Sequence, residues 1–171
     1  MATYTLISSN VLASNASSIT FSAIPATYTD LVIKFTARST SADTDPTNTA
    51  RLRIDLNGDS STGSITSLLG NGATTSSFRD AGTNYVLGLQ GTNTTSNTFT
   101  NGEIYVPSYT ASQSKPFSVL AVTETNATTA LTSAGANLWA NSSAITSVTL
   151  QALFGSIVAG SSFHLYGIKN S

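Results

Sequence analysis

The chain has 171 residues, a formal net charge of −1 and no cysteine, and only 9% of its residues are charged. Without cysteine it forms neither a disulfide framework nor a thiolate metal site, and without a basic run it is not expected to bind nucleic acid. It has no stretch of 18 apolar residues and no signal-peptide pattern, so we expect a soluble chain with no membrane partner and no secretion. Its length suits one domain over residues 1–171.

Alternation of apolar with hydroxyl-bearing residues predicts strands in the first third of the chain. In a strand, alternate side chains share a face, and threonine and β-branched residues suit such a surface. The runs at residues 19–23 and 31–37 alternate around a turn that contains Pro25. We expect both runs to lie in one sheet and to build one wall of a sandwich. Further strands are predicted at residues 3–8 and 50–56, the second followed by the turn residues Asn57 and Gly58.

The middle of the chain carries weaker strand signals. Short strands are predicted at residues 65–69 and 83–89, with residues 78–80 in the loop between them. Residues 99–106 contain Asn101-Gly102 and are either two extended pieces around a turn or one strand with a bulge. Polar loops are expected at residues 39–48 and 91–97.

The last third predicts three longer strands and one ambiguous segment. The strands are expected at residues 117–125, 144–154 and 162–168. Between the first two, a strand near residues 136–140 competes with a helix over 128–138, which its threonines and a glycine disfavour. In total, roughly nine or ten short strands separated by turn signals indicate an all-β sandwich.

Catalytic and metal-binding motifs do not occur in the sequence. The single histidine, His164, lies on a predicted strand, and no G-x-S-x-G motif accompanies it. The eight acids show no paired spacing, and Asp30 and Asp59 are interpreted as turn formers or caps. The run from Asp55 to Asp59 lacks the glycine and glutamate of an EF-hand loop. We predict no catalytic residue, no cofactor and no metal; a polysaccharide hydrolase that uses His164 and an acid is the enzymatic alternative.

Three aromatic residues have two interpretations. Tyrosine and tryptophan are enriched at protein interfaces, and on this ground Tyr85, Tyr109 and Trp139 are candidate interface residues. The alternative is that they belong to the core, and the sequence leaves both open. Tyr105 has the same two interpretations, whereas phenylalanines on strand-like runs are assigned to the core.

Seven segments share a common pattern of strands and turns. They are TYTLISSNVL at residues 3–12, ITFSAIPATYTDLVIKFTAR at 19–38, RLRIDLNGDS at 51–60, GEIYVPSY at 102–109, KPFSVLAVTETNAT at 115–128, ITSVTLQALFG at 145–155 and FHLYGIK at 163–169. Together they resemble small virion structural proteins of tailed bacteriophages, notably of phages that infect cyanobacteria. The resemblance spans nearly the whole chain and includes no catalytic residue.

This resemblance implies a fold, a role and a partner. The fold is a jelly-roll-like antiparallel β-sandwich, and the role is that of a non-enzymatic capsid decoration or cement protein. The implied partner is the major capsid protein, and the implied assembly is a homotrimer. The chain would be made in the host cytoplasm and would then lie on the capsid surface of the virion. The alternative is a tail-fibre or receptor-binding module that recognises host surface glycans through the loops at residues 39–48 and 92–97.

Overall fold

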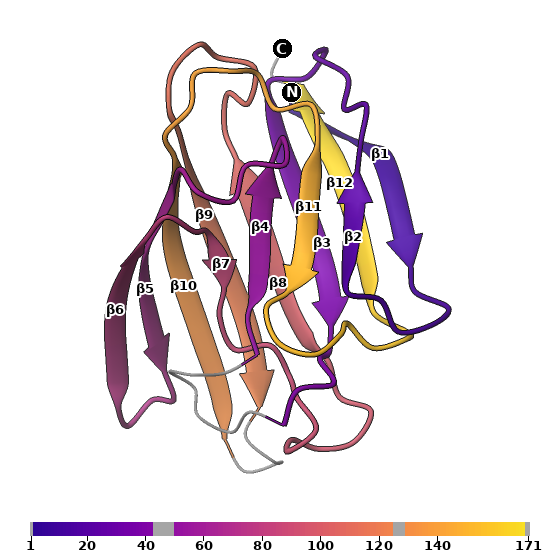
Figure 1. Ribbon diagram of the computed structural model, residues 1–171, viewed down its shortest axis with the longest axis vertical. Helices are drawn as coiled ribbons and strands as arrows, with labels where there is room; N and C mark the ends of the chain where they lie inside the picture. Colours follow the sequence, from indigo (N-terminus) through magenta and orange to yellow (C-terminus); the bar gives the residue numbers. More distant parts are fainter. Residues whose placement is uncertain (1, 43–49, 125–128, 170–171) are drawn as a thin grey trace.

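The computed structural model describes residues 2–42, 50–124 and 129–169 (Figure 1). Within these residues the chain forms twelve strands, and no helix long and apolar enough to span a membrane is found there. The strands are β1 (Thr3–Val11), β2 (Ser18–Phe21), β3 (Asp30–Ala37), β4 (Leu52–Leu56), β5 (Gly63–Gly70), β6 (Thr75–Ala81), β7 (Tyr85–Val86), β8 (Thr100–Val106), β9 (Lys115–Glu124), β10 (Ala130–Trp139), β11 (Val148–Ala152) and β12 (Ser162–Lys169).

The strands form two antiparallel sheets that face each other. The larger sheet has eight strands in the order β1-β12-β3-β8-β9-β10-β5-β6, and the smaller has four in the order β2-β11-β4-β7. Eight strands pair in a nested way: β1 with β12, β2 with β11, β3 with β8, and β4 with β7. These pairs belong alternately to the larger and the smaller sheet. The predicted all-β sandwich is therefore confirmed.

The other four strands widen the larger sheet. β5 pairs with β6, β9 pairs with β10, and β10 also pairs with β5, so the four form one continuous addition beside β8. In Figure 1 this addition occupies the left-hand side, and β5 and β6 lie beyond the edge of the smaller sheet. The larger sheet consequently has a broad outer face.

Alternate side chains from the two sheets fill the space between them. Leu31, Ile33 and Phe35 of β3 are buried in this core together with Ile54 and Leu150 of the smaller sheet. Burying each such side chain contributes about 1.5–3 kcal/mol, so apolar packing is the main stabilising term. Lys34 and Thr36 face outward on either side of Phe35, which produces the alternation seen in the sequence, whereas Val32 is buried.

The two runs at residues 19–23 and 31–37 lie in different sheets, which corrects the expectation that they build one wall. The first run forms β2 at the edge of the smaller sheet, and the second forms β3 inside the larger sheet. Alternation reports which face of a strand is buried and carries no information about the sheet that the strand joins. Ala23 has φ 54°, and the chain turns there to cross from one sheet to the other.

Other expectations for the middle of the chain were also wrong. Residues 78–80 belong to strand β6 and not to a loop, and β7 contains only two residues. Residues 100–106 form one strand whose register to its neighbours is uninterrupted, so Asn101-Gly102 is neither a turn nor a bulge. The strand expected near residues 136–140 is confirmed as the end of the ten-residue strand β10, and the alternative helix is wrong. The predicted turn at Asn57 and Gly58 is confirmed, with φ angles of 54° and 73°.

A buried lysine fixes the start of β9, and sequence reasoning missed it. Lys115 is only 2% exposed, and its ammonium group donates to the carbonyl oxygens of Gln113, Asn141 and Ser143 at 2.8, 3.2 and 2.6 Å. The same group lies 5.4 Å from the centre of the Trp139 ring. Burial lowers the pKa of Lys115, and the three carbonyl oxygens partly replace the water that the cation has lost.

Candidate interaction surface

Tyr85, Tyr109 and Trp139 all lie in the protein interior. Tyr109 and Trp139 belong to the main core, and Tyr85 packs in a smaller cluster with Ile65 and Leu87. Their polar atoms bond within the chain as well. The Tyr109 hydroxyl donates to the carbonyl of Pro25, and the Trp139 indole donates to Asp59.

The hydrogen bonds of Tyr85, Tyr109 and Trp139 also bear on whether these residues belong to the core or to an interface. The Tyr85 hydroxyl accepts a hydrogen bond from Thr83 at 2.8 Å, so none of the three has a polar group directed at a partner. The structure buries all three, which favours the core interpretation, and does not bring them together on a common surface. Tyr105 also bonds internally, through its hydroxyl to Asp30 at 3.0 Å.

His164 lies on β12 with its side chain on the outer face of the larger sheet. Its neighbours in the chain, Phe163 and Leu165, are buried, as the alternation predicts. Its partners in register are Ser9 and Lys34, neither of them an acid. In the three described ranges, no group of three or more histidine, cysteine or acidic side chains is placed to hold a metal ion.

Asp30 and Asp59 both accept hydrogen bonds from backbone N–H groups. Asp30 accepts from the backbone of Ser108 at 2.8 Å, and so ties the start of β3 to the turn after β8. Asp59 accepts from the backbones of Ser61 and Thr62 at 2.9 and 3.2 Å and from Trp139 at 2.9 Å. Asp59 is thus the turn former that the sequence predicts, and Asp30 has in Ser108 a partner that is remote in sequence.

The hydrogen bonds to Asp59 predict a pH-dependent contribution to stability. Bonds from Thr62, Ser61 and Trp139 hold the pKa of Asp59 well below its usual value. The unfolded chain then takes up a proton at a higher pH than the folded chain, so this stabilisation is complete above about pH 4 and is lost as the pH falls below it. We expect Asp59→Asn to cost about 1 kcal/mol at pH 7 and less at pH 2.5, where the unfolded chain is protonated at this position, measured by urea unfolding. Equal losses at both pH values would contradict this role.

A buried arginine organises the loop between β7 and β8. Arg38 is 8% exposed, and its guanidinium donates to the carbonyl oxygens of Gly91, Thr95 and Thr98 at 2.6, 2.8 and 2.8 Å. A rigid fork of five N–H donors suits such a set of converging carbonyls. The loop therefore folds around a side chain that comes from the end of β3, more than fifty residues earlier.

A carboxylate binds the same loop from the other side. Glu124, at the end of β9, accepts from the backbone N–H of Thr95 at 2.9 Å and from its hydroxyl at 3.1 Å. It also accepts from the Thr98 hydroxyl at 3.2 Å and from the Gln90 amide at 3.1 Å. We call residues 91–98, held between Arg38 and Glu124, the clamped loop.

The clamped loop presents uncharged polar groups to solvent. Thr92, Asn93, Ser96 and Asn97 are exposed, and the backbone N–H of Thr92 bonds the carbonyl of Ser41 at 2.8 Å. It contains the loop at residues 92–97 that was singled out for recognition. The other loop singled out, at residues 39–48, lies outside the described residues from position 43 onward.

A second exposed surface lies on the outer face of the larger sheet. Leu120 of β9, Ala134 of β10 and Leu68 of β5 are direct cross-strand partners in one row, and the two leucines are 55% and 58% exposed. We call the surrounding set of exposed, uncharged outward residues the outer patch. Its members are Thr66, Leu68, Ser118, Leu120, Val122, Thr132, Ala134 and Ala136.

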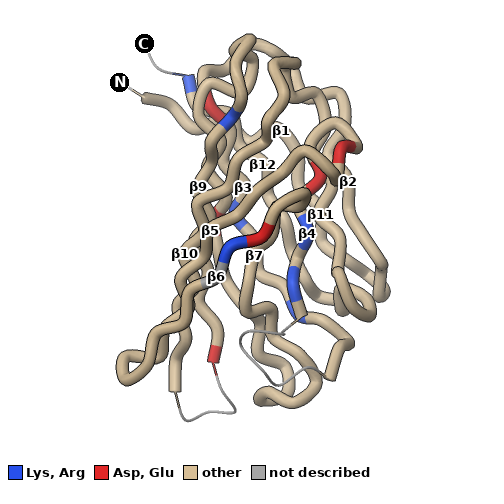
Figure 2. The backbone as a smooth tube through the Cα atoms, turned by 60° about the vertical axis from the view of Figure 1, so that its left-hand side comes forward, with Lys and Arg blue, Asp and Glu red and all other residues tan. Residues whose placement is uncertain are grey.

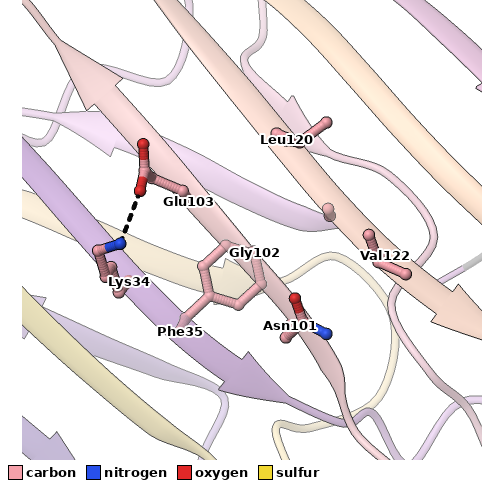
Figure 3. Close-up of a pocket in the computed structure, with 8 residues that line it drawn as sticks. Lys34, Phe35, Asn101, Gly102, Glu103, Leu120 and Val122 are labelled. Carbon is pink, nitrogen blue, oxygen red and sulfur yellow. Dashed lines mark ion pairs between the residues drawn. The ribbon is translucent and has the colours of Figure 1, made fainter.

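A shallow hollow of about 320 Å³ adjoins the outer patch (Figure 3). Leu120 and Val122 form one side of it, and the ion pair between Lys34 and Glu103, at 3.0 Å, forms the other. The hydrogen bond and charge of Glu103 raise the pKa of Lys34. Because the two charges neutralise each other, the rim of the hollow carries no net charge.

The two outer faces of the sandwich differ in chemistry. The smaller sheet presents Thr20 and Thr149, which bond each other at 2.8 Å, and Arg53, which bonds Gln151 at 2.5 Å and pairs with Asp55. Figure 2 shows charged positions scattered over the backbone and none along β5 and β10. An uncharged patch with exposed leucine and valine side chains on a sheet face is a candidate protein contact.

No family model matches the chain, and no curated protein or solved structure matches it significantly.

Proposed function

We propose that this chain is a non-enzymatic structural protein of a tailed-phage virion, namely a capsid decoration or cement protein that binds the major capsid protein. The sequence resemblance supports this role. Its seven segments coincide with strands β1, β2, β3, β4, β8, β9, β11 and β12, so they account for seven of the eight strands in the nested pairs. The resemblance thus follows the framework of the fold and leaves out the added strands β5, β6 and β10.

The assignment of the sandwich to the jelly-roll class is part of the same proposal. A jelly roll consists of eight strands in two sheets, wound as two Greek keys. The nested pairing of β1 with β12, β2 with β11, β3 with β8 and β4 with β7 supports that description. The added hairpins β5-β6 and β9-β10 then extend one sheet of the roll. The homotrimer that the resemblance implies stays a prediction for the chain bound to the shell, at local three-fold positions.

The clamped loop is the observation that carries the proposed role. A protein that covers gaps between shell subunits needs fixed hydrogen-bonding groups with little charge, and many modest contacts then add up through multivalency. Arg38 and Glu124 hold the loop in one arrangement, and the side chains of Thr92, Asn93, Ser96 and Asn97 are exposed, two of which also donate to the carbonyl oxygens of Ser41 and Ala42. Because the loop is already ordered, binding costs it little conformational entropy.

Binding to isolated shells tests this proposal. Purified chain is mixed with shells assembled from the major capsid protein alone and is then sedimented. We expect the chain to pellet with the shells to a saturating ratio, and Asn93→Ala combined with Asn97→Ala to weaken binding. Recovery of the chain in the supernatant at every ratio would contradict a decoration role.

The clamped loop also favours a second candidate, a receptor-binding module of the tail. Hydroxyl and amide groups suit hydrogen bonding to the glycans of a host surface as well as to a protein shell. Fluorescently labelled chain should then bind susceptible host cells and lose this binding when surface glycans are removed. Binding to cells but not to shells would replace the first proposal with this one.

A further inference from the structure

We infer that two copies of this chain associate face to face through the outer patch. The strongest observation is the row that runs across the larger sheet from the hollow beside Glu103 through Leu120 and Ala134 to Leu68. The row carries a recess near one end and a protruding leucine at the other. Such a row is complementary to a reversed copy of itself.

The spacing of the row matches a two-fold axis. Neighbouring strands lie about 4.8 Å apart, so Leu68 on β5 stands roughly 12 Å from the hollow between β8 and β9. A two-fold axis parallel to the strands and close to β10 exchanges these two positions. Leu68 of each copy then enters the hollow of the other, which is the reciprocal contact that an isologous interface requires.

The side chains at the axis allow the two sheets to approach. Ala134 and Ala136 point outward from β10, and neither projects far enough to hold the sheets apart. Thr132 completes the outward side of this strand next to Val122. The bulky groups of the patch are displaced to either side of β10, so the leucines of one copy pack beside those of the other.

Charge favours a second copy over a charged partner. None of the eight residues of the outer patch is charged, and Lys34 and Glu103 at the rim of the hollow already pair with each other. A reversed copy presents the same uncharged patch, and the exposed Arg79 of β6, the cross-strand partner of Thr66, lies at its border. A strongly acidic or basic partner would find no opposite charge on the patch itself.

Sedimentation equilibrium of the purified full chain tests this pairing. We expect a mass of twice the chain mass of 17.6 kDa at concentrations up to about 100 µM. Leu68→Asp and Leu120→Asp should each raise the dissociation constant at least roughly 100-fold, because they place a carboxylate in a dry contact. Circular dichroism checks that both variants keep the wild-type fold.

Leu6→Asp is the matched control. Leu6 lies on the same outer face, on β1, with a similar exposure of 53%, and it is outside the patch. We expect this variant to remain dimeric. A monomeric or trimeric wild-type chain would overturn the inference, and so would a Leu6→Asp variant that dissociates like the patch variants.

A cross-linking experiment keeps the inference testable if the aspartate variants misfold. The chain contains no cysteine, so Ala134→Cys introduces a single thiol next to the proposed axis and Tyr4→Cys a single thiol far from it. A short bismaleimide should couple the first variant into dimers and leave the second monomeric. Equal coupling of the two would contradict the pairing. Both experiments use the chain alone, so their failure leaves the virion proposal untouched.

Discussion

Arg38→Ala is expected to release the clamped loop and to lower the free energy of unfolding by about 3 kcal/mol. The substitution leaves the carbonyl oxygens of Gly91, Thr95 and Thr98 without their charged donor. Water can reach the emptied position only by loosening the loop. Hydrogen exchange should therefore show faster exchange of the backbone amides at residues 91–98, and chemical unfolding should show the loss of stability.

Binding to shells should weaken in the same variant, because the loop then has to be ordered on contact. Arg79→Ala is the control, since Arg79 is an exposed residue on β6 and its loss should change stability by less than about 0.5 kcal/mol. If Arg38→Ala leaves exchange in the loop at the wild-type rate, Arg38 does not hold the loop.

Gly102→Ala is expected to destabilise the fold by about 2–3 kcal/mol through overpacking. A Cβ atom at this position would lie 2.7 Å from the carbonyl oxygen of Leu120 and closer still to the ring of Phe35. Phe35 stacks on Phe163 with ring centres 6.2 Å apart, so it cannot turn aside freely. Thermal and urea unfolding of the variant measure the effect.

Gly70→Ala provides the matched comparison on β5. A Cβ atom there would have its nearest neighbour, a methyl group of Thr75, at 3.4 Å, so we expect no destabilisation. Similar losses in the two variants would mean that the cost arises from removing a glycine from a strand and not from the ring beneath Gly102.

The same glycine illustrates what local sequence reasoning can and cannot predict. Asn-Gly is a strong turn signal, and it was correct at Asn57-Gly58, where both residues have positive φ. At Asn101-Gly102 the chain stays extended, and the glycine is required by the Phe35 ring of the neighbouring strand. That ring is 67 positions away in sequence, so a local sequence pattern cannot predict the contact.

Strand positions were more predictable than strand partners. Alternation located β3, β9 and β12 to within a few residues, because a strand with one buried face repeats every second residue. It did not reveal that β2 and β3 lie in opposite sheets. It also missed β6, where most of the side chains that the structure describes are exposed and show no alternation.

The candidate surfaces depend on contacts that join distant parts of the chain. Arg38 reaches the clamped loop across 53 to 60 positions, with bonds to Gly91 and Thr98 at its limits. The outer patch exists only because β10 lies between β9 and β5. Tyr85, Tyr109 and Trp139 were chosen by residue type, and their burial shows that type alone does not separate a core aromatic from an exposed one.

The number of copies of this chain in purified virions tests the proposed function most directly. Quantitative gel analysis or mass spectrometry gives its ratio to the major capsid protein. A decoration protein that repeats with the symmetry of the shell is expected at copy numbers on the order of hundreds per virion. About a dozen copies, located at the tail, would contradict the proposal and favour the receptor-binding alternative.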